Sequence, residues 1–269
     1  MNKSDNKHTG FRLHYLEILN WGTFDENIYP ITPNGHNSLL TGANASGKTT
    51  LADAILTLLV PPQQRHYNQS SGAENKRERD EKSYFLGAYS SSQAENELTV
   101  KTEYLRKNPN EIYSVLLAYF YNAGTDQSVT LAQIRWFNTE LKRLFLVSAN
   151  KLTIKEHFLN QIDPGGEWRK RFRKLPKTKL FDTFSEYSAY FANLFGLKSE
   201  KALNLFNLTV GIKVLGNLND FVRKHMLEDT AIEDEFDKLR DNYHNLINAH
   251  TALEKAREQL RLLEPIIVD

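Results

Sequence analysis

Residues 42–49 combine side chains and glycines at a spacing that suits phosphate chemistry. They read Gly-Ala-Asn-Ala-Ser-Gly-Lys-Thr and fit the Walker A pattern G-x-x-x-x-G-K-[ST]. Glycines let the backbone curl around a phosphate, so that successive N–H groups point at the anion. In such a loop the lysine contacts the β- and γ-phosphates of ATP, and the final hydroxyl ligates Mg²⁺. We therefore predict an ATP·Mg²⁺ site with Thr49 as the metal ligand. Its nucleotide-binding residues are Gly42, Ala43, Asn44, Ala45, Ser46, Gly47, Lys48, Thr49 and Thr50.

The segments on either side of this loop have the order that a phosphate site requires. Residues 37–41 form a short apolar run that predicts a buried strand. Residues 50–60 predict a buried helix that ends at Pro61-Pro62. The N-terminus of that helix adds a positive partial charge beside a bound phosphate. The alternative is a glycine-rich turn that binds no ligand.

Composition limits the remaining chemistry. The 269 residues suffice for one large or two small domains with a core. The chain has no cysteine, which excludes disulfides, thiolate catalysis and cysteine-based zinc sites. Its formal net charge is +1, so any DNA contact must come from a local basic patch. No apolar run is long enough to span a membrane, and residues 1–7 lack a signal-peptide core. We therefore expect a cytoplasmic protein with no membrane contact.

Strand-like segments lie on both sides of the loop, and residues 11–19 show the alternation typical of a strand. Residues 11–19 and 27–31 read as two strands before it, and the polar stretch 61–82 after it reads as a surface excursion. Four later segments predict an antiparallel meander: 97–106, 112–121, 129–137 and 142–147. From residue 155 the pattern turns helical. It predicts short helices at 182–195, 199–206 and 218–227.

The last forty residues have a different pattern. Mostly apolar side chains recur at alternating steps of four and three, which is typical of a coiled-coil seam. The seam positions are Ile232, Phe236, Leu239, Tyr243, Leu246, His250, Leu253, Arg257 and Leu260. A seam of this kind needs a partner helix, whereas the alternative is an amphipathic helix lying on a globular domain. We predict two domains, residues 1–228 and the start of a coiled-coil arm at 229–269.

A complete phosphate-loop ATPase also needs an acid that holds Mg²⁺ and positions water. The sequence offers no convincing candidate. Residues 265–269 imitate such a motif at the end of the coiled-coil stretch, and Ser70-Ser71-Gly72 imitate the signature loop of ABC-type ATPases within a polar segment. We therefore predict no catalytic residue in this chain, which then holds half of an active site.

Half a site followed by one coiled-coil strand resembles the heads of the SMC, RecF and MukB group. Residues 16–24 and 39–50 look like the N-terminal lobe of that group. Residues 83–89 and 211–227 are similar to the JetC family, the MukB-like motor subunits of Wadjet plasmid-defence systems. The resemblance implies an α/β fold, namely the N-terminal lobe of a P-loop ABC/SMC-type head. This lobe would carry an antiparallel meander, a small helical region and an emerging coiled-coil helix.

The resemblance also implies partners and an activity. A C-terminal lobe would complete the head and supply the missing acid and signature loop. Two heads would then sandwich two ATP molecules, with kleisin and KITE subunits bridging them. The implied activity is ATP-driven head engagement and DNA loop extrusion in defence against plasmids and other foreign DNA. Two alternatives remain open: the N-terminal lobe of a RecF- or SbcC-type repair ATPase, and a nucleotide-independent coiled-coil interaction module.

One segment departs from the pattern of that group. ABC-type heads carry a glutamine that touches Mg²⁺, and its place falls near residues 206–210. This chain has Asn207-Leu208-Thr209 there. Either Asn207 takes the role of the glutamine, or the equivalent position lies elsewhere.

A basic cluster at residues 168–179 suits a nucleic-acid backbone. Trp168 and Phe172 are interleaved with its bases, and sequence-independent phosphate contacts are what a motor on DNA requires. The predicted DNA-binding residues are Arg169, Lys170, Arg171, Arg173, Lys174, Lys177 and Lys179. The alternative is a solvated loop balanced by acidic residues 228–237. Trp21 and Phe24 either stack on adenine or belong to the core.

Overall fold

The computed structural model describes residues 9–65, 67, 80–92, 101–109, 112–163, 166–197, 203 and 232–263. The chain divides into two compact units, residues 1–216 and residues 217–269, and each is described by itself. The predicted domain boundary after residue 228 lies outside the described residues, as do the predicted helix at 218–227 and all of the predicted helix at 199–206 except residue 203.

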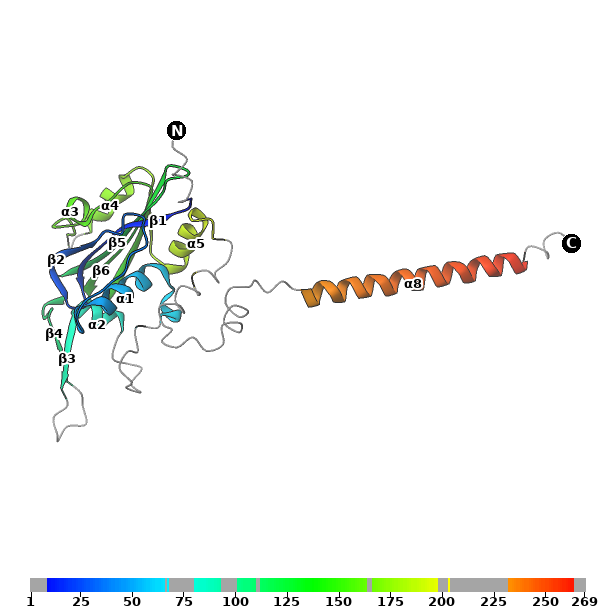
Figure 1. The fold of residues 1–269 in the computed structure, drawn as a ribbon, viewed down its shortest axis with the longest axis horizontal. Coiled ribbons are helices and arrows are strands. Elements are labelled where there is room, and N and C mark those ends of the chain that lie inside the picture. Colours follow the sequence, from blue (N-terminus) through cyan, green and yellow to red (C-terminus); the bar gives the residue numbers. More distant parts are fainter. Residues whose placement is uncertain are drawn as a thin grey trace. The chain divides into compact units, whose positions relative to one another are not determined.

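A six-stranded antiparallel sheet forms the centre of the first unit (Figure 1). Its strand order is β2-β1-β5-β6-β7-β8. The strands are β1 (Arg12–Trp21), β2 (Phe24–Ile31), β5 (Tyr113–Asn122), β6 (Gln127–Asn138), β7 (Glu140–Ser148) and β8 (Thr178–Phe181). The antiparallel meander predicted from the β-like segments at 112–121, 129–137 and 142–147 is confirmed in β5, β6 and β7. The two N-terminal strands belong to the same sheet, because β1 pairs with β5 in the register Ile18↔Leu116.

Turn residues explain where the central hairpins close. Asp126 and Thr139 have positive φ values of 51° and 59°. Aspartate tolerates this conformation, whereas the β-branched Thr139 adopts it because the connection between its two strands is a single residue. Asp126 lies just before β6, and Thr139 is the residue between β6 and β7. A smaller sheet pairs β3 (Ala88–Ser92) with β4 (Lys101–Tyr104), which confirms part of the strand predicted at 97–106.

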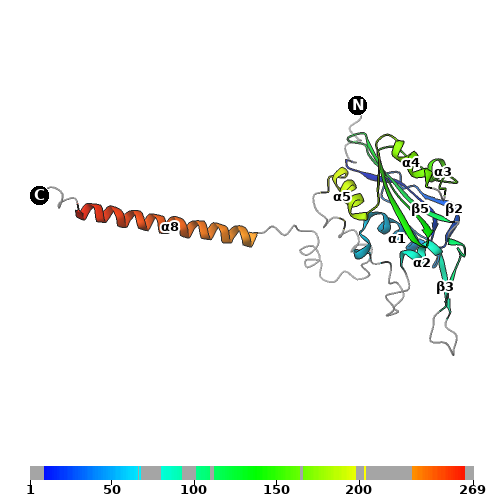
Figure 2. The ribbon, with the colours of Figure 1, turned by 180° about the vertical axis from the view of Figure 1, so that it is seen from behind.

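Helices cover both faces of the large sheet (Figures 1 and 2). On one face lie α1 (Lys48–Leu59), α2 (Glu81–Leu86) and α5 (Phe184–Leu194), and the turn η2 (Pro62–Gln64) follows α1. On the other face lie α3 (Ile154–His157) and α4 (Glu167–Lys174). The two layers have separate apolar cores, one around Leu16, Leu58 and Leu116 and the other around Leu117, Ile134 and Phe172. The fold class is therefore α/β, as the sequence predicted.

Two local predictions are wrong. Residues 37–41 do not form a buried strand, because Leu39 and Leu40 are 87% and 48% exposed. A strand needs a neighbour for its backbone groups, and within the described residues no strand pairs with this segment. The helical region predicted from residue 155 is interrupted by β8, which pairs with β7 in the register Leu146↔Leu180. Four residues of alternation are too short a signal to detect against the helical pattern around them.

The second unit contains the long helix α8 (Ile232–Leu263), which has 32 residues. It matches the uninterrupted helix that the seam predicted. Described side chains from residue 236 to residue 263 are all exposed, including large apolar ones such as Phe236 and Leu246. Ion pairs between residues three apart, such as Arg261 with Glu258, line its flanks.

Candidate nucleotide-binding site

The predicted phosphate loop leads from the exposed segment into the N-terminus of α1. Ala45 and Gly47 have left-handed backbone conformations, with φ values of 63° and 89°. Such conformations curl a chain so that successive N–H groups face one side, which is the arrangement that binds anions. Residues 42–46 are exposed, so this arrangement is accessible to a ligand.

Gly47 is required for two reasons. Its positive φ is costly for any residue with a side chain. In addition, a Cβ atom there would lie 2.7 Å from Cζ of Phe24. The ring of Phe24, at the start of β2, therefore packs against the loop at the point where α1 begins.

The Lys48 side chain folds back over the loop. Its Nζ donates hydrogen bonds to the carbonyl oxygens of Gly42, at 2.7 Å, and Ala43, at 2.6 Å. A phosphate can replace these carbonyls as acceptors, because a hydrogen bond between two ionised groups is stronger than one to a neutral carbonyl. The ammonium group and the loop N–H groups thus fit the phosphates of a nucleotide.

The predicted Mg²⁺ ligand, Thr49, is the second residue of α1. Mg²⁺ usually takes most of its ligands from phosphates and water, with few from protein. In the described part of the chain, no group of three or more His, Asp or Glu residues could hold a metal. Asp53, the next acid along α1, is buried and accepts a hydrogen bond from the Tyr84 hydroxyl. These residues therefore fit a Mg²⁺ ion that would be held by the Thr49 hydroxyl and the phosphates of a nucleotide.

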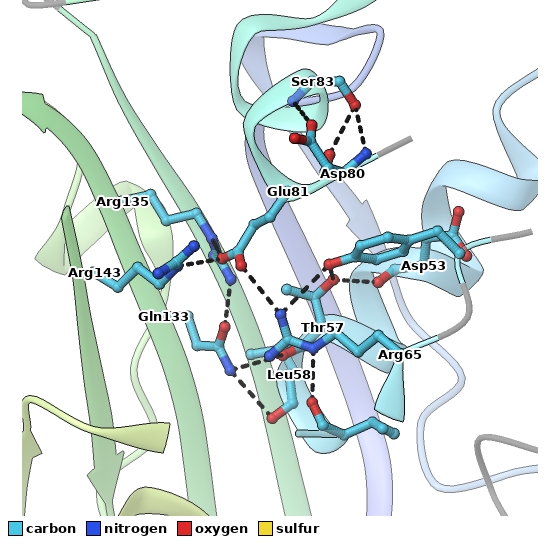
Figure 3. A network of polar contacts seen from close by, with 12 residues as sticks. Asp53, Thr57, Leu58, Arg65, Asp80, Glu81, Ser83, Gln133, Arg135 and Arg143 are labelled. Atoms are coloured by element: carbon cyan, nitrogen blue, oxygen red, sulfur yellow. Dashed lines mark hydrogen bonds and ion pairs between the residues drawn. The ribbon is translucent and has the colours of Figure 1, made fainter. Parts of the chain in front are cut away.

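The C-terminal end of α1 is held by a buried polar network (Figure 3). Nη2 of Arg65 donates to the Thr57 carbonyl at 2.9 Å, and Nε of Arg65 donates to the Val60 carbonyl at 2.7 Å. Nε2 of Gln133, from β6, donates to the carbonyls of Thr57 and Leu58. Donors at this end satisfy the last helix carbonyls, and the Arg65 charge complements their negative partial charge.

Glu81 is the centre of this network. Its carboxylate accepts from Nε of Arg135 at 2.5 Å, from Nε of Arg143 at 3.0 Å and from Nη1 of Arg65 at 3.3 Å. Burial alone would raise the pKa of Glu81, but these three guanidinium groups outweigh it and lower the pKa to about 2. The carboxylate therefore stays ionised and ties α2, β6 and β7 to the segment after α1.

Sequence reasoning did not identify this network. A signal was present in β6, where Gln133 and Arg135 are two residues apart with apolar residues directly before, between and after them. Residues two apart in a strand share a face, so this pair indicates a buried polar site on the side that α1 covers. Their partner Glu81 could not be found in this way, because it follows a long polar stretch.

Trp21 belongs to the core and is not exposed to a nucleotide. Its side chain is fully buried, and its ring stacks on Tyr84 with centroids 4.8 Å apart. The Arg135 guanidinium lies 5.0 Å from the centroid of the same ring. Stacking of Trp21 on adenine is therefore excluded by the packing, whereas Phe24 is only half-buried beside the loop.

The predicted DNA-binding cluster lies on α4 and β8 and on the short turn between them, across the sheet from α1. Trp168 and Phe172 are buried against the sheet, so neither can stack on a base as the interleaved pattern suggested. Arg169 packs over the rings of Trp136 and Trp168, and Arg171 donates to the His157 carbonyl. The bases that remain exposed on α4 and on the turn after it are Lys170, Arg171, Arg173, Lys174 and Lys177. Lys179 is also exposed, but its ammonium group lies 4.4 Å from the ring centroid of Tyr190 on α5, so it does not share a face with the bases of α4.

Several predicted features lie outside the described residues. These are the segment Ser70-Ser71-Gly72, the glutamine-loop position at 206–210, the 211–227 segment and the acidic ending at 265–269. Among the described helices, none is long and apolar enough to cross a membrane.

Comparison with known proteins agrees on the phosphate loop. The family model described as the P-loop containing region of AAA domain matches residues 13–74. This match includes β1 from its second residue onward, β2, the loop and α1. The first unit therefore contains a P-loop region of ATPase type.

Two solved structures are similar to parts of the chain. One is described as "Structural biochemistry of ATP-driven dimerization and DNA stimulated activation of SMC ATPases"; it is 17% identical, with 68% of this chain and 99% of that chain covered and a TM-score of 0.30. The other is the SmcHead bound to the C-winged helix domain of ScpA; it is 18% identical, with 54% of this chain and 38% of that chain covered and a TM-score of 0.29. No curated protein matches the sequence.

Proposed function

We propose that this chain is the ATP-binding N-terminal lobe of an SMC-like motor ATPase that acts on DNA in the cytoplasm. The observation that carries the proposal is the loop at residues 42–49. Its residues 42–46 are exposed, its backbone is left-handed at Ala45 and Gly47, and the Lys48 ammonium lies over its own carbonyls. In the proposed complex, Lys48 contacts the β- and γ-phosphates, the loop N–H groups surround them, and Thr49 ligates Mg²⁺.

A C-terminal lobe is the proposed first partner. The apolar side chains of Leu39 and Leu40 are exposed directly before the loop. A strand from another lobe would pair with this segment, bury both leucines and bring the missing Mg²⁺-binding acid next to the loop. Hydrolysis also requires the signature loop of a second head, so ATP turnover belongs to the head dimer.

The exposed seam of helix α8 is the observation that supports a coiled-coil arm and its proposed partners. Its apolar seam is exposed along its described length, and an exposed seam of this length is typical of a helix that lacks its partner in a coiled coil. We assign the antiparallel return strand of the same arm as the partner. Kleisin and KITE subunits then bridge two heads, as in the group that the sequence resembles.

The basic surface of α4 and of the turn after it is the proposed DNA contact. Arg173, Lys174 and Lys177 are exposed, and among the described residues they form no ion pair, so their charges are free to meet phosphates. Such contacts bind DNA of any sequence, as a loop-extruding motor requires.

Plasmid defence of the Wadjet type is the favoured biological role. It rests on the likeness of residues 83–89 and 211–227 to the JetC family. The described part of that likeness is α2 with the glycine turn after it, where Gly87 has a φ of 71°. The second candidate is a RecF- or SbcC-type repair ATPase, and kleisin and KITE genes beside the parent gene would decide between the two.

ATP binding tests the proposal directly. Titration calorimetry should show that this chain binds ATP·Mg²⁺, and Lys48→Ala should remove most of the affinity because the phosphates lose their cation. Lys82→Ala, which removes an exposed lysine from α2, is the matched control and should bind like the wild type. Equal affinity in the wild type and Lys48→Ala would contradict the assignment.

A further inference from the structure

Arg106 is a buried arginine that no part of the proposed ATP site has used. It follows β4, and its side chain is 3% exposed. Nε donates to the Phe85 carbonyl at 2.5 Å, and Nη2 donates to the Tyr84 carbonyl at 2.8 Å. Through these two hydrogen bonds the guanidinium binds the C-terminal end of α2.

The same guanidinium also holds the turn between β1 and β2. Nη2 donates to the Gly22 carbonyl at 2.8 Å, and Nη1 pairs with the Asp25 carboxylate at 2.6 Å. The Gly22 amide in turn donates to the Tyr84 carbonyl at 2.7 Å. Arg106 is therefore the clamp that joins residues 22–25 to α2.

This turn packs directly on the phosphate loop. A Cβ atom at Gly22 would lie 2.6 Å from Cγ2 of Thr50, and one at Gly47 would lie 2.7 Å from Cζ of Phe24. The turn thus touches the loop at its last glycine and at the first turn of α1. A shift of the turn would move Gly47 and the residues on both sides of it.

The Arg106 guanidinium is closely surrounded, and the acceptors around it suit an arginine side chain. A Cβ atom at Gly87 would lie 2.8 Å from Nη2 of Arg106 and 2.8 Å from the Gly22 carbonyl oxygen. The acceptors around Arg106 lie on two different segments. A planar fork of donors can bond to all of them, whereas a lysine ammonium of similar charge cannot span the same set.

We propose that Arg106 is a positioning residue for the phosphate loop: by clamping residues 22–25 to α2, it holds Phe24 and Gly22 against Gly47 and Thr50. The inference rests on the proposed binding of ATP at this loop. Arg106 does not touch the nucleotide in this scheme. It keeps the loop N–H groups aimed at the phosphates, and without it ATP affinity falls.

The test compares two buried arginines. Arg106→Lys should weaken ATP binding by roughly tenfold, which is within the range seen for residues that act through a packed network. Arg65→Lys is the matched control, because the Arg65 side chain is also 3% exposed but bonds to the far end of α1. It should lose comparable thermal stability and keep its ATP affinity. Calorimetry well below the melting temperature of each variant measures the affinities.

A double-mutant cycle separates positioning from general loosening. Phe24→Leu alone should weaken ATP binding, and in the Arg106→Lys background it should weaken it little further, because both changes act through the same turn. The proposal is overturned if the losses of ATP affinity in the two single variants add up in the double variant. It is also overturned if Arg106→Lys binds ATP within twofold of the wild type, or if Arg65→Lys loses as much ATP affinity as Arg106→Lys.

Two further results have a clear meaning. If Arg106→Lys does not fold, Asp25→Asn replaces it, since this change weakens one arm of the clamp and should reduce affinity by about threefold. An unchanged affinity in Asp25→Asn then overturns the proposal. If the folded wild-type chain binds no ATP, the proposed function itself fails and the positioning role fails with it. Binding by the wild type with unchanged variants defeats the positioning role alone.

Discussion

Replacing Glu81 with glutamine is expected to lower the free energy of unfolding by about 3 kcal/mol at pH 7. The carboxylate of Glu81 pairs with Arg135, Arg143 and Arg65, and Arg135 is 0% exposed. The amide that replaces it carries no charge. Arg135 would then be a buried cation without its counter-ion, which typically costs about 3–5 kcal/mol.

The pKa of Glu81 gives an independent magnitude. It is about 2 in the folded protein against an ordinary value of 4.5. One pKa unit corresponds to about 1.4 kcal/mol, so the three arginines stabilise the folded state by about 3 kcal/mol through this group. Because the folded pKa is the lower one, this contribution is complete above about pH 4.5. It is lost as the pH falls from about 4.5 to about 2.

Urea unfolding followed by tryptophan fluorescence measures the effect. The three tryptophans, Trp21, Trp136 and Trp168, all lie in the first unit and report on the sheet. The stability gap between the wild type and Glu81→Gln should be largest at pH 7. At pH 3 it should narrow to less than about half, because the wild-type carboxylate begins to lose its advantage.

The control is Glu167→Gln, which neutralises an exposed acid paired with exposed Lys170. Exposed pairs contribute little, so this variant should unfold like the wild type at both pH values. The reasoning is refuted if Glu81→Gln unfolds within about 1 kcal/mol of the wild type at pH 7. It is equally refuted if the gap stays constant between pH 7 and pH 3.

Three other predictions concern the proposed function. The purified chain should not turn over ATP in a steady-state phosphate-release assay, because hydrolysis needs an acid and a signature loop from other lobes; turnover that Lys48→Ala abolishes would contradict this. The amides of α8 should exchange rapidly with deuterium in a monomeric sample, since the helix has no described packing partner, and protection along its whole length would exclude an unpartnered arm. In the assembled head dimer, neutralising Arg173, Lys174 and Lys177 together should weaken binding to two unrelated DNA duplexes equally, as measured by fluorescence anisotropy. The slope of log K against log salt concentration should fall in magnitude by about 0.9 for each DNA phosphate that the protein no longer neutralises. Neutralising Lys82, Lys107 and Lys142 is the matched control, and an equal effect of both triplets would remove the basic cluster from DNA binding.

Local signals in the sequence were sufficient to predict the phosphate loop, the central strands and the long helix. The phosphate loop was recognisable because its chemistry depends on the spacing of a few residues, and the positive φ at Gly47 is one that glycine adopts without cost. The central strands were predictable because their apolar runs, rich in β-branched and aromatic residues, suit a sheet that is covered on both faces. The long helix α8 was predictable for a similar reason, since its seam repeats without an interrupting glycine or proline.

Burial and long-range pairing were decided only by the tertiary structure. Residues 37–41 have the composition of a strand, yet a strand forms only where a neighbour accepts its hydrogen bonds, and the described sheet offers none. Trp168 and Phe172 looked available to nucleic acid, but a helical step of four puts both on the side of α4 that faces the sheet.

The buried polar clusters around Arg106 and Glu81 show the same division most clearly. Arg106 meets Gly22 across 84 positions of sequence, and Arg135 meets Glu81 across 54. No spacing rule connects residues so far apart, because their proximity depends on how β1, β5 and β6 pair and on which face α2 covers. The sequence therefore predicted which residues form the phosphate loop, and the packing decided which buried polar residues meet around α1 and α2.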